Sequence, residues 1–246
     1  MAKNGLGGRA SADMTTSHDV SDRQLPRGAG DAADVPPIPA ASVILLRDSP
    51  LEVLMIRRHE KSTFVPDAWV FPGGAVDAAD HELGDGTELG TMRVAAAREL
   101  FEESGIWLGE DLTDADEKRR ALLTGETTFA ALVREARIDL EGLVWTSRWI
   151  TPVGVPRRFD TYFFLAIAGR DAVASAENVE AVEVRWIAPA EAIEKLQLVF
   201  PTQKNLEAIA GFASAEELIA SRRGLEIPTT RPMLVVEDGK KRIILP

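Results

Sequence analysis

Residues 98–106 constrain this chain more than any other stretch, because they place three acids at helical spacing. They read R-E-L-F-E-E-S-G-I and contain Glu99, Glu102 and Glu103. An α-helix has about 3.6 residues per turn, so these spacings put the three carboxylates on one face. Gly105 follows, and glycine suits the left-handed residue that ends a helix. The stretch therefore predicts a helix with an acidic face that ends just before Gly105.

The acidic face calls for a cation, because stacked carboxylates repel each other by roughly a few tenths of a kcal/mol per pair. A solvated helix face is the simpler explanation of an isolated E-x-x-E-E pattern. Here Arg98, Leu100, Gly105 and Ile106 also stand at fixed offsets. At average residue usage, so complete a match arises by chance in on the order of one chain in ten thousand or fewer. We therefore interpret the stretch as part of a functional site.

The stretch resembles the second half of the Nudix box, whose family pattern is G-x5-E-x7-R-E-U-x-E-E-x-G-U with U aliphatic. The first half follows the sequence F-P-G-G, so that Gly74 and Asp80 occupy the G-x5-E positions. Two departures stand out. An aspartate, Asp80, replaces the glutamate, and seventeen residues separate it from Arg98 where the pattern has seven. These departures leave Asp80 without an assigned role.

The ten extra residues interrupt the box before its helix. They include Gly84, Asp85, Gly86 and Gly90, a composition typical of turns. We therefore predict a loop inserted ahead of the helix. Because the insertion lies outside the run of glutamates, we expect the geometry of the carboxylates to be unaffected.

The resemblance implies an α/β fold, namely a Nudix-type α/β/α sandwich with a mixed β-sheet, in a single domain with extra helices. It also implies Mg²⁺ or Mn²⁺ as the cofactor, because carboxylate oxygens are ligands that such hard ions prefer. Glu99, Glu102 and Glu103 are the expected metal ligands, with the carbonyl of Gly74 as a further one. Arg98 is expected to orient a glutamate through a charge-assisted hydrogen bond.

The general base is one glutamate, either of this set or Glu180. Many Nudix members carry a further metal-binding or catalytic glutamate just before a late strand, and Glu180 matches that place best. Glu183 and Glu177 are alternatives. A plain acidic residue at a strand edge is the other interpretation of Glu180.

Three further residues are candidates for substrate contact. Gly73, like Gly74, has no side chain, so its backbone can closely approach a phosphate, although a tight turn also explains the pair. Arg157 and Arg158 precede an aromatic strand and can bind phosphate or carboxylate groups. A pair of surface arginines is the alternative.

The predicted reaction is hydrolysis of a diphosphate that joins a nucleoside to a group X. The interrupted box, a helical insert before Trp145 and the strand P-R-R-F-D-T-Y-F-F-L-A resemble the coenzyme A diphosphatase-type branch. Coenzyme A or acyl-coenzyme A is therefore the preferred substrate. NADH, ADP-ribose or a nucleotide sugar is the alternative, and a proline that many ADP-ribose enzymes carry after the box is missing. A non-catalytic ligand sensor is a third hypothesis. Loss of box glutamates would favour it, but all three are present.

Composition and net charge indicate which classes of partner the chain is expected to bind. The chain has 246 residues and a net charge of −11, which disfavours a nucleic-acid polymer but not a small phosphorylated substrate. The absence of a long apolar run predicts no membrane span, and the absence of cysteine excludes disulfides. Residues 1–38 lack a signal-peptide core and are rich in aspartate, so we expect a cytoplasmic protein. Whether it forms a homodimer is left open.

The domain boundaries follow from composition and periodicity. Residues 1–38 are predicted to be a disordered N-terminal tail, and residues 39–246 a single Nudix hydrolase domain. Within it we expect a helical insert at about 113–137, with lining of the substrate's distal end as one role open to it. Closing helices and a hairpin with an Asp-Gly turn are expected at about 200–246. Predicted strands include 41–47, 52–58, 69–71, 106–108, 143–150 and 157–166.

Overall fold

The computed structural model describes residues 16–21, 24–30, 32–60, 62, 65–110, 112–169, 172–176 and 181–246. Its centre is a mixed sheet with the order β4-β3-β2-β7-β6-β9, in which β5 pairs with β2 and β8 with β3. The pairs β2–β7 and β6–β9 are parallel, and the others are antiparallel. The strands are β2 (Ile38–Arg47), β3 (Glu52–Arg58), β4 (Trp69–Val70), β5 (Gly73–Ala75), β6 (Val144–Ile150), β7 (Phe159–Ile167), β8 (Ala181–Ile187) and β9 (Thr229–Thr230).

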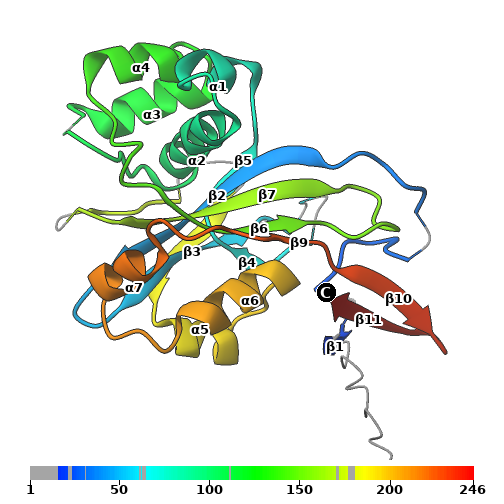
Figure 1. The fold of residues 1–246 in the computed structure, drawn as a ribbon. Coiled ribbons are helices and arrows are strands. Elements are labelled where there is room, and N and C mark those ends of the chain that lie inside the picture. Colours follow the sequence, from blue (N-terminus) through cyan, green and yellow to red (C-terminus); the bar gives the residue numbers. More distant parts are fainter. Residues whose placement is uncertain are drawn as a thin grey trace, which may run out of the picture.

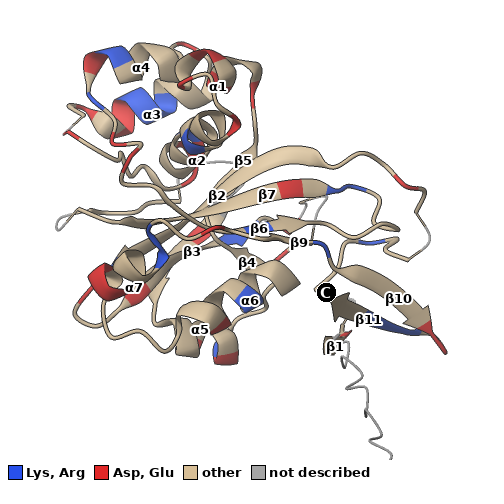
Figure 2. Cartoon of the chain, viewed as in Figure 1, with Lys and Arg blue, Asp and Glu red and all other residues tan. Residues whose placement is uncertain are grey.

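Helices cover both faces of this sheet, which confirms the predicted sandwich (Figure 1). One layer contains α1 (Ala78–Leu83), α2 (Glu88–Ser104), α3 (Ala115–Leu123) and α4 (Phe129–Glu135). The other layer contains α5 (Pro189–Lys195), α6 (Phe200–Ile209) and α7 (Ala215–Arg222). Figure 2 shows many charged residues on these outer helices and few along the central strands.

The sheet separates two hydrophobic cores. Along β2, Ile44 and Leu46 belong to the core under α5–α7, whereas Val43 and Leu45 belong to the core under α2–α4. All four side chains are fully buried. Successive residues of a strand point to opposite faces, so a strand covered on both faces needs an unbroken apolar run.

Two predictions of local structure are wrong. The insertion in the box is mostly helical: α1 spans part of it, and α2 already begins at Glu88, so that Gly90 lies inside a helix. The side chain of Thr87 caps α2 by accepting the Gly90 N–H at 3.0 Å. Residues 106–108 form no strand, because no described strand pairs with them and the adjoining Gly109 makes only an isolated bridge, to Ile138.

The two ends of the described chain meet in a second sheet. Strand β1 (Thr16–Val20) pairs with β11 (Lys240–Leu245), which pairs with β10 (Met233–Glu237), all antiparallel (Figure 1). The predicted C-terminal hairpin is confirmed, and Asp238 and Gly239 both have positive φ, as its turn requires. The predicted disordered tail differs from the structure over residues 16–21 and 24–30, because β1 finds its partner over two hundred residues away. Residues 1–15 lie outside the described part.

The helical insert is confirmed as α3 and α4, which lie beside α2 on the far side of the sheet from α5–α7 (Figure 1). No helix within the described ranges is long and apolar enough to cross a membrane.

Candidate active site

Helix α2 brings the three box glutamates to one place, where Glu103 is buried and Glu99 and Glu102 are partly buried. The helix ends at Ser104, and Gly105 follows with φ 76° and donates its N–H to the Phe101 carbonyl at 2.9 Å. Glu103 is only 7% exposed. The side chains of Glu99 and Glu102 are 14% and 23% exposed. The acidic face therefore points into the protein and is not a solvated surface.

Arg98 is the cation among these acids. Its Nη1 donates to Glu99 Oε1 at 2.8 Å and to Glu102 Oε2 at 3.2 Å. Its Nη2 donates to the Ala75 carbonyl at 2.9 Å. The remaining bonds, from Nε and Nη2, go to both oxygens of Asp80 at 3.0 and 2.9 Å. All five N–H groups of the guanidinium are thus used, in a fork geometry that only arginine offers.

Asp80 has a role that sequence reasoning did not assign. Its side chain is 1% exposed and accepts hydrogen bonds from Arg98 with both carboxylate oxygens. Oδ2 also accepts the backbone N–H of Asp77 at 2.8 Å, at the start of α1. Asp80 therefore connects the first half of the box to the second half across the inserted residues.

The two glycines of β5 approach the glutamates closely. The N–H of Gly73 donates to Glu103 Oε2 at 2.8 Å. A Cβ added to Gly74 would lie 2.5 Å from the carboxylate carbon of Glu99, and one added to Gly73 would lie 2.4 Å from the Ala41 carbonyl oxygen. Both positions therefore require glycine for close packing against α2 and β2.

Burial and the charges of neighbouring groups set the pKa values of this cluster. It raises the pKa of Glu102, and the charge and hydrogen bond of Arg98 oppose that rise only in part. Burial alone would lower the pKa of Arg98, but the hydrogen bonds to Asp80 and the charges of Glu99 and Asp80 raise it. Arg98 therefore stays charged, while the carboxylate of Glu102 is held at an energetic cost.

The donor set fits a hard divalent cation by its chemistry, because it consists of carboxylate and carbonyl oxygens. In this structure Glu99 and Glu102 accept hydrogen bonds from Arg98, and Glu103 accepts one from the N–H of Gly73. Within the part of the chain that the structure describes, no group of three or more His, Cys, Asp or Glu side chains is gathered as a metal site.

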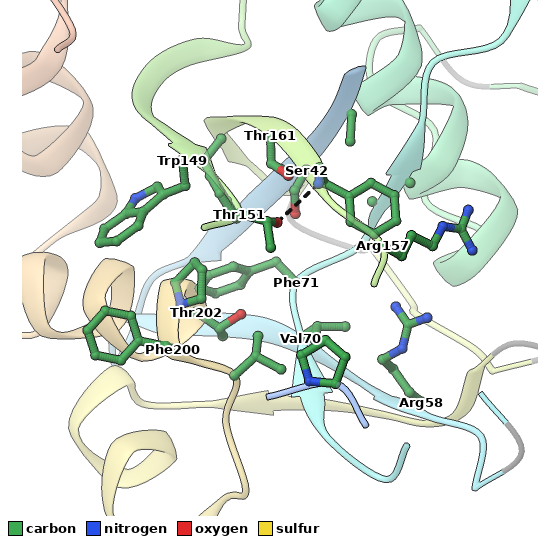
Figure 3. Close-up of a pocket in the computed structure, with 18 of the residues that line it drawn as sticks. Ser42, Arg58, Val70, Phe71, Trp149, Thr151, Arg157, Thr161, Phe200 and Thr202 are labelled. Atoms are coloured by element: carbon green, nitrogen blue, oxygen red, sulfur yellow. Dashed lines mark hydrogen bonds between the residues drawn. The ribbon is translucent and has the colours of Figure 1, made fainter. Parts of the chain in front are cut away.

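A cavity of about 780 Å³ opens beside the glutamates. Glu99, Glu103, Gly73 and Gly74 line it at one end. Figure 3 shows the side chains of Arg58 and Arg157 facing each other on one side, and Trp149, Phe71 and Phe200 on another. Of the described residues between 113 and 137, none lines the cavity, so the structure gives the helical insert no contact with it.

The side chains of Arg157 and Arg158, the two candidate arginines before β7, point to different parts of the protein. Arg157 lines the cavity, with its guanidinium carbon 5.0 Å from the ring centroid of Phe159. Arg158 turns elsewhere: it pairs with Asp34 and donates to the carbonyls of Val35 at 2.8 Å and Thr151 at 2.9 Å. It therefore ties down the segment before β2.

Arg58, at the end of β3, is a cavity residue that sequence reasoning missed. It donates to Ser62 Oγ at 3.1 and 2.8 Å. Among described residues, eight other arginines pair with carboxylates, whereas Arg58 and Arg157 pair with none. The signal in the sequence was the basic end of its strand, which by itself does not reveal where the side chain points.

The candidates near β8 give no second acidic ligand within the described residues. Glu180 and Glu177 lie outside them. Glu183 is on β8, where it pairs with Arg57 at 3.4 Å and accepts from Arg185 at 2.5 Å. It does not line the cavity.

Comparison with known proteins shows which family of proteins the chain resembles. A protein of Caenorhabditis elegans named as nudix hydrolase 7 is 34% identical over 163 residues, which is 63% of this chain and 53% of that protein. Acyl-coenzyme A diphosphatase NUDT19 of Xenopus laevis is 30% identical over 237 residues, covering 69% of this chain. This chain thus spans about half to 62% of the length of these relatives.

A crystal structure of a NUDIX hydrolase from Alicyclobacillus acidocaldarius superposes with a TM-score of 0.69 and 26% identity. The match covers 76% of this chain and 97% of that one. The family model described as the NUDIX domain matches residues 36–208, which include the glycines of β5, the whole of α2 and every strand of the central sheet except β9. This protein therefore belongs to the Nudix family.

Proposed function

We propose that the chain hydrolyses the diphosphate linkage of a nucleoside diphosphate joined to a group X, with coenzyme A or acyl-coenzyme A as the substrate. The observation that carries this proposal is the cluster of Arg98, Glu99, Glu102 and Glu103, held against Gly73 and Gly74 at one end of a cavity of about 780 Å³. A cavity of this size suits a large cofactor-like substrate.

In this proposal Glu99, Glu102, Glu103 and the Gly74 carbonyl hold Mg²⁺ or Mn²⁺. When bound, such an ion neutralises charge on the diphosphate and lowers the pKa of a water molecule. Arg98 keeps Glu99 and Glu102 in fixed positions. One glutamate, of this set or Glu180, takes the proton of the attacking water as its oxygen bonds to phosphorus and the bridging P–O bond breaks. Two phosphate esters leave.

The substrate choice rests on three supports. The relative from Xenopus laevis is named an acyl-coenzyme A diphosphatase. Arg58 and Arg157 offer cationic contacts to phosphate groups at the side of the cavity (Figure 3). Much of the remaining lining is apolar and aromatic, which favours a substrate whose X group is itself largely apolar.

The direct test is a substrate panel with the purified full chain and Mg²⁺ or Mn²⁺. The panel contains coenzyme A, an acyl-coenzyme A, NADH, ADP-ribose and a nucleotide sugar, and the products are identified by mass spectrometry. We expect 3′,5′-ADP and phosphopantetheine or its acyl derivative. Preferential cleavage of NADH or ADP-ribose would overturn the substrate assignment. Binding without turnover across the panel would favour a ligand sensor.

The glutamate assignment is tested by Glu102→Gln and Glu103→Gln. Each is expected to lower kcat by about a hundredfold or more, because several kcal/mol of charge stabilisation by the metal are lost. Circular dichroism should show that the fold survives. Glu117→Gln, on the exposed first turn of α3, is the matched control and should retain full activity. Near-normal kcat in both site variants would refute the metal assignment.

A further inference from the structure

The cavity extends beyond the part of the chain that matches the family. The NUDIX domain model covers residues 36–208. The lining of the cavity also includes Gln24, Leu25 and Pro26 before this range, and Pro232 and Ile243 after it. The two ends of the described chain thus add a wall that lies outside the matched domain.

This wall is anchored firmly to the body of the protein. On β1, His18 lies opposite Ile243 of β11, and its ring centroid is 5.6 Å from that of Phe200 on α6. Gln24 Nε2 donates to Gln203 Oε1 at 3.0 Å, again on α6. Leu25 and Ile243 are 7% and 2% exposed and belong to the core under α5–α7. The chain ends are therefore part of that core.

The wall faces the apolar part of the cavity. Leu25 and Ile243 share a core cluster with four other lining residues, Phe71, Trp149, Phe163 and Phe200, and the rings of Trp149 and Phe200 meet edge to face at 6.2 Å. Figure 3 shows Trp149 and Phe200 on the side away from Arg58 and Arg157. One cavity thus has the glutamates in its lining together with an aromatic part, to which Leu25 and Ile243 of the wall contribute from the same core cluster.

Two hydroxyl groups of the cavity lining are already used within the protein. The hydroxyl of Ser42 donates to the Pro72 carbonyl at 2.8 Å, and that of Thr151 accepts the Phe159 N–H at 3.0 Å. The side chains of Leu25, Phe200 and Ile243 offer no hydrogen-bond partner, so a sugar or a base packed against them would leave polar groups without partners, which is costly in a buried site. An alkyl chain has no such requirement and gains from burial.

We propose that the chain ends form the binding wall for the acyl group of an acyl-coenzyme A, and that Leu25 and Ile243 limit the length of chain that fits. This inference rests on the proposed function for its substrate, but it concerns a different part of the cavity. It names a specificity determinant that lies outside the matched domain.

Binding can be measured without turnover. Isothermal titration of the full chain, in EDTA, with coenzyme A and a series from acetyl- to palmitoyl-coenzyme A reports affinity alone. We expect the affinity to rise by up to about fourfold for each added methylene until the cavity is filled, and then to level off or fall. Affinities that do not depend on the acyl chain would overturn the proposal.

The length limit is tested at Ile243. Ile243→Phe fills the wall and should shorten the longest acyl chain that gains affinity, whereas Ile243→Ala should lengthen it. Leu245→Phe is the matched control, since it lies two residues further along β11 and packs against the same core but does not line the cavity. Equal profiles for Ile243→Phe and Leu245→Phe would refute the role of Ile243. If Ile243→Phe does not fold, the shift in Ile243→Ala decides.

The two proposals fail differently. Length-dependent binding in EDTA with no cleavage of any substrate would sustain the binding wall and refute the proposed reaction. Cleavage of coenzyme A and every acyl derivative with identical kcat/KM, together with length-independent binding, would sustain the reaction and refute the wall.

Discussion

Arg98 organises the candidate site because a single planar guanidinium satisfies four partners at once. Its five bonds reach Asp80, Ala75, Glu99 and Glu102. A buried cation of this kind also offsets the repulsion among neighbouring carboxylates, which otherwise raises their pKa values. The site is thus built around a fixed cation, and the glutamates are oriented before any metal binds.

The backbone of Gly74 lies so close to the side chain of Glu99 that a larger residue at this position would disturb the glutamate cluster. We predict that Gly74→Ala lowers kcat by about a hundredfold, because its Cβ would lie 2.5 Å from the carboxylate of Glu99 and must displace it. Overpacking of this kind should also lower the free energy of unfolding by about 1–3 kcal/mol. Steady-state kinetics and urea unfolding measure both effects. Gly211→Ala is the control, since no atom lies within 4 Å of the added Cβ. Equal activities of the two variants would contradict the prediction.

Arg58 and Arg157 allow a prediction about substrate binding. Replacing either with Met keeps much of the side-chain volume but removes a charged hydrogen-bond donor, so KM should rise by about tenfold or more while kcat changes little. Arg57→Met is the matched control, because Arg57 is adjacent on β3 but pairs with Glu183 and does not line the cavity. If KM rises equally in the control, the effect reflects overall charge and not contact with the substrate.

At the scale of elements, the sequence predicts well whatever depends on local spacing. The acidic helix and its end at Ser104 follow from residue periodicity and from Gly105, and both are observed. The error lies in the insertion, where glycine was interpreted as a sign of a loop. Gly90 is inside α2, and a Cβ there would lie 2.0 Å from Asp85 Oδ1. This glycine makes room for a neighbouring side chain and does not break the helix.

Other features depend on contacts that no local pattern reveals. Strand β1 exists because β11 offers it an edge, and an isolated segment of that composition gives no sign of such a partner. The roles of Asp80 and Arg58 depend on what the fold brings beside them. The separation of Arg157 from Arg158 follows from the segment around Asp34 that captures the second arginine.

Helix α3 supports the end of α2 through Arg119, whose side chain is fully buried. Its Nε donates to the Glu102 carbonyl at 3.1 Å and its Nη1 to Ser175 Oγ at 2.8 Å. A cation is favourable at a helix C-terminus, where carbonyl groups lack partners. The helical insert therefore acts on the site from behind and not through the cavity.

We predict that Arg119→Met lowers the free energy of unfolding by about 3 kcal/mol, since buried hydrogen-bonded groups lose their partner. It should also lower kcat, because the backbone that carries Glu102 and Glu103 loses a fixed contact. Urea unfolding and kinetics under native conditions test the two parts separately. The control is Arg120→Met, at the exposed neighbouring position of the same helix. Unfolding free energies that match in the two variants would contradict the support role.

At the scale of the whole molecule, the two faces of the sheet carry different parts of the candidate site. The α2–α4 layer carries and supports the glutamates. The core beneath α5–α7 contains the aromatic end of the cavity together with Val20, Leu25 and Ile243 from the chain ends. A ligand that fills this end must therefore contact segments more than two hundred residues apart in the sequence.

This arrangement predicts a change in hydrogen exchange that depends on the acyl group. A local opening of the terminal sheet has to separate Leu25 and Ile243 from the cavity, so a bound acyl chain loses its contacts in the open state and raises the free energy of opening. In EDTA, a long-chain acyl-coenzyme A should therefore slow exchange in residues 24–30 and 240–245, as measured by mass spectrometry of peptides. Coenzyme A itself should not slow exchange there. Helix α7, which does not line the cavity, is the internal control. Unchanged exchange in residues 240–245 with the acylated ligand would mean that the acyl group lies elsewhere, because a chain that touches Ile243 cannot leave the opening of its strand unaffected.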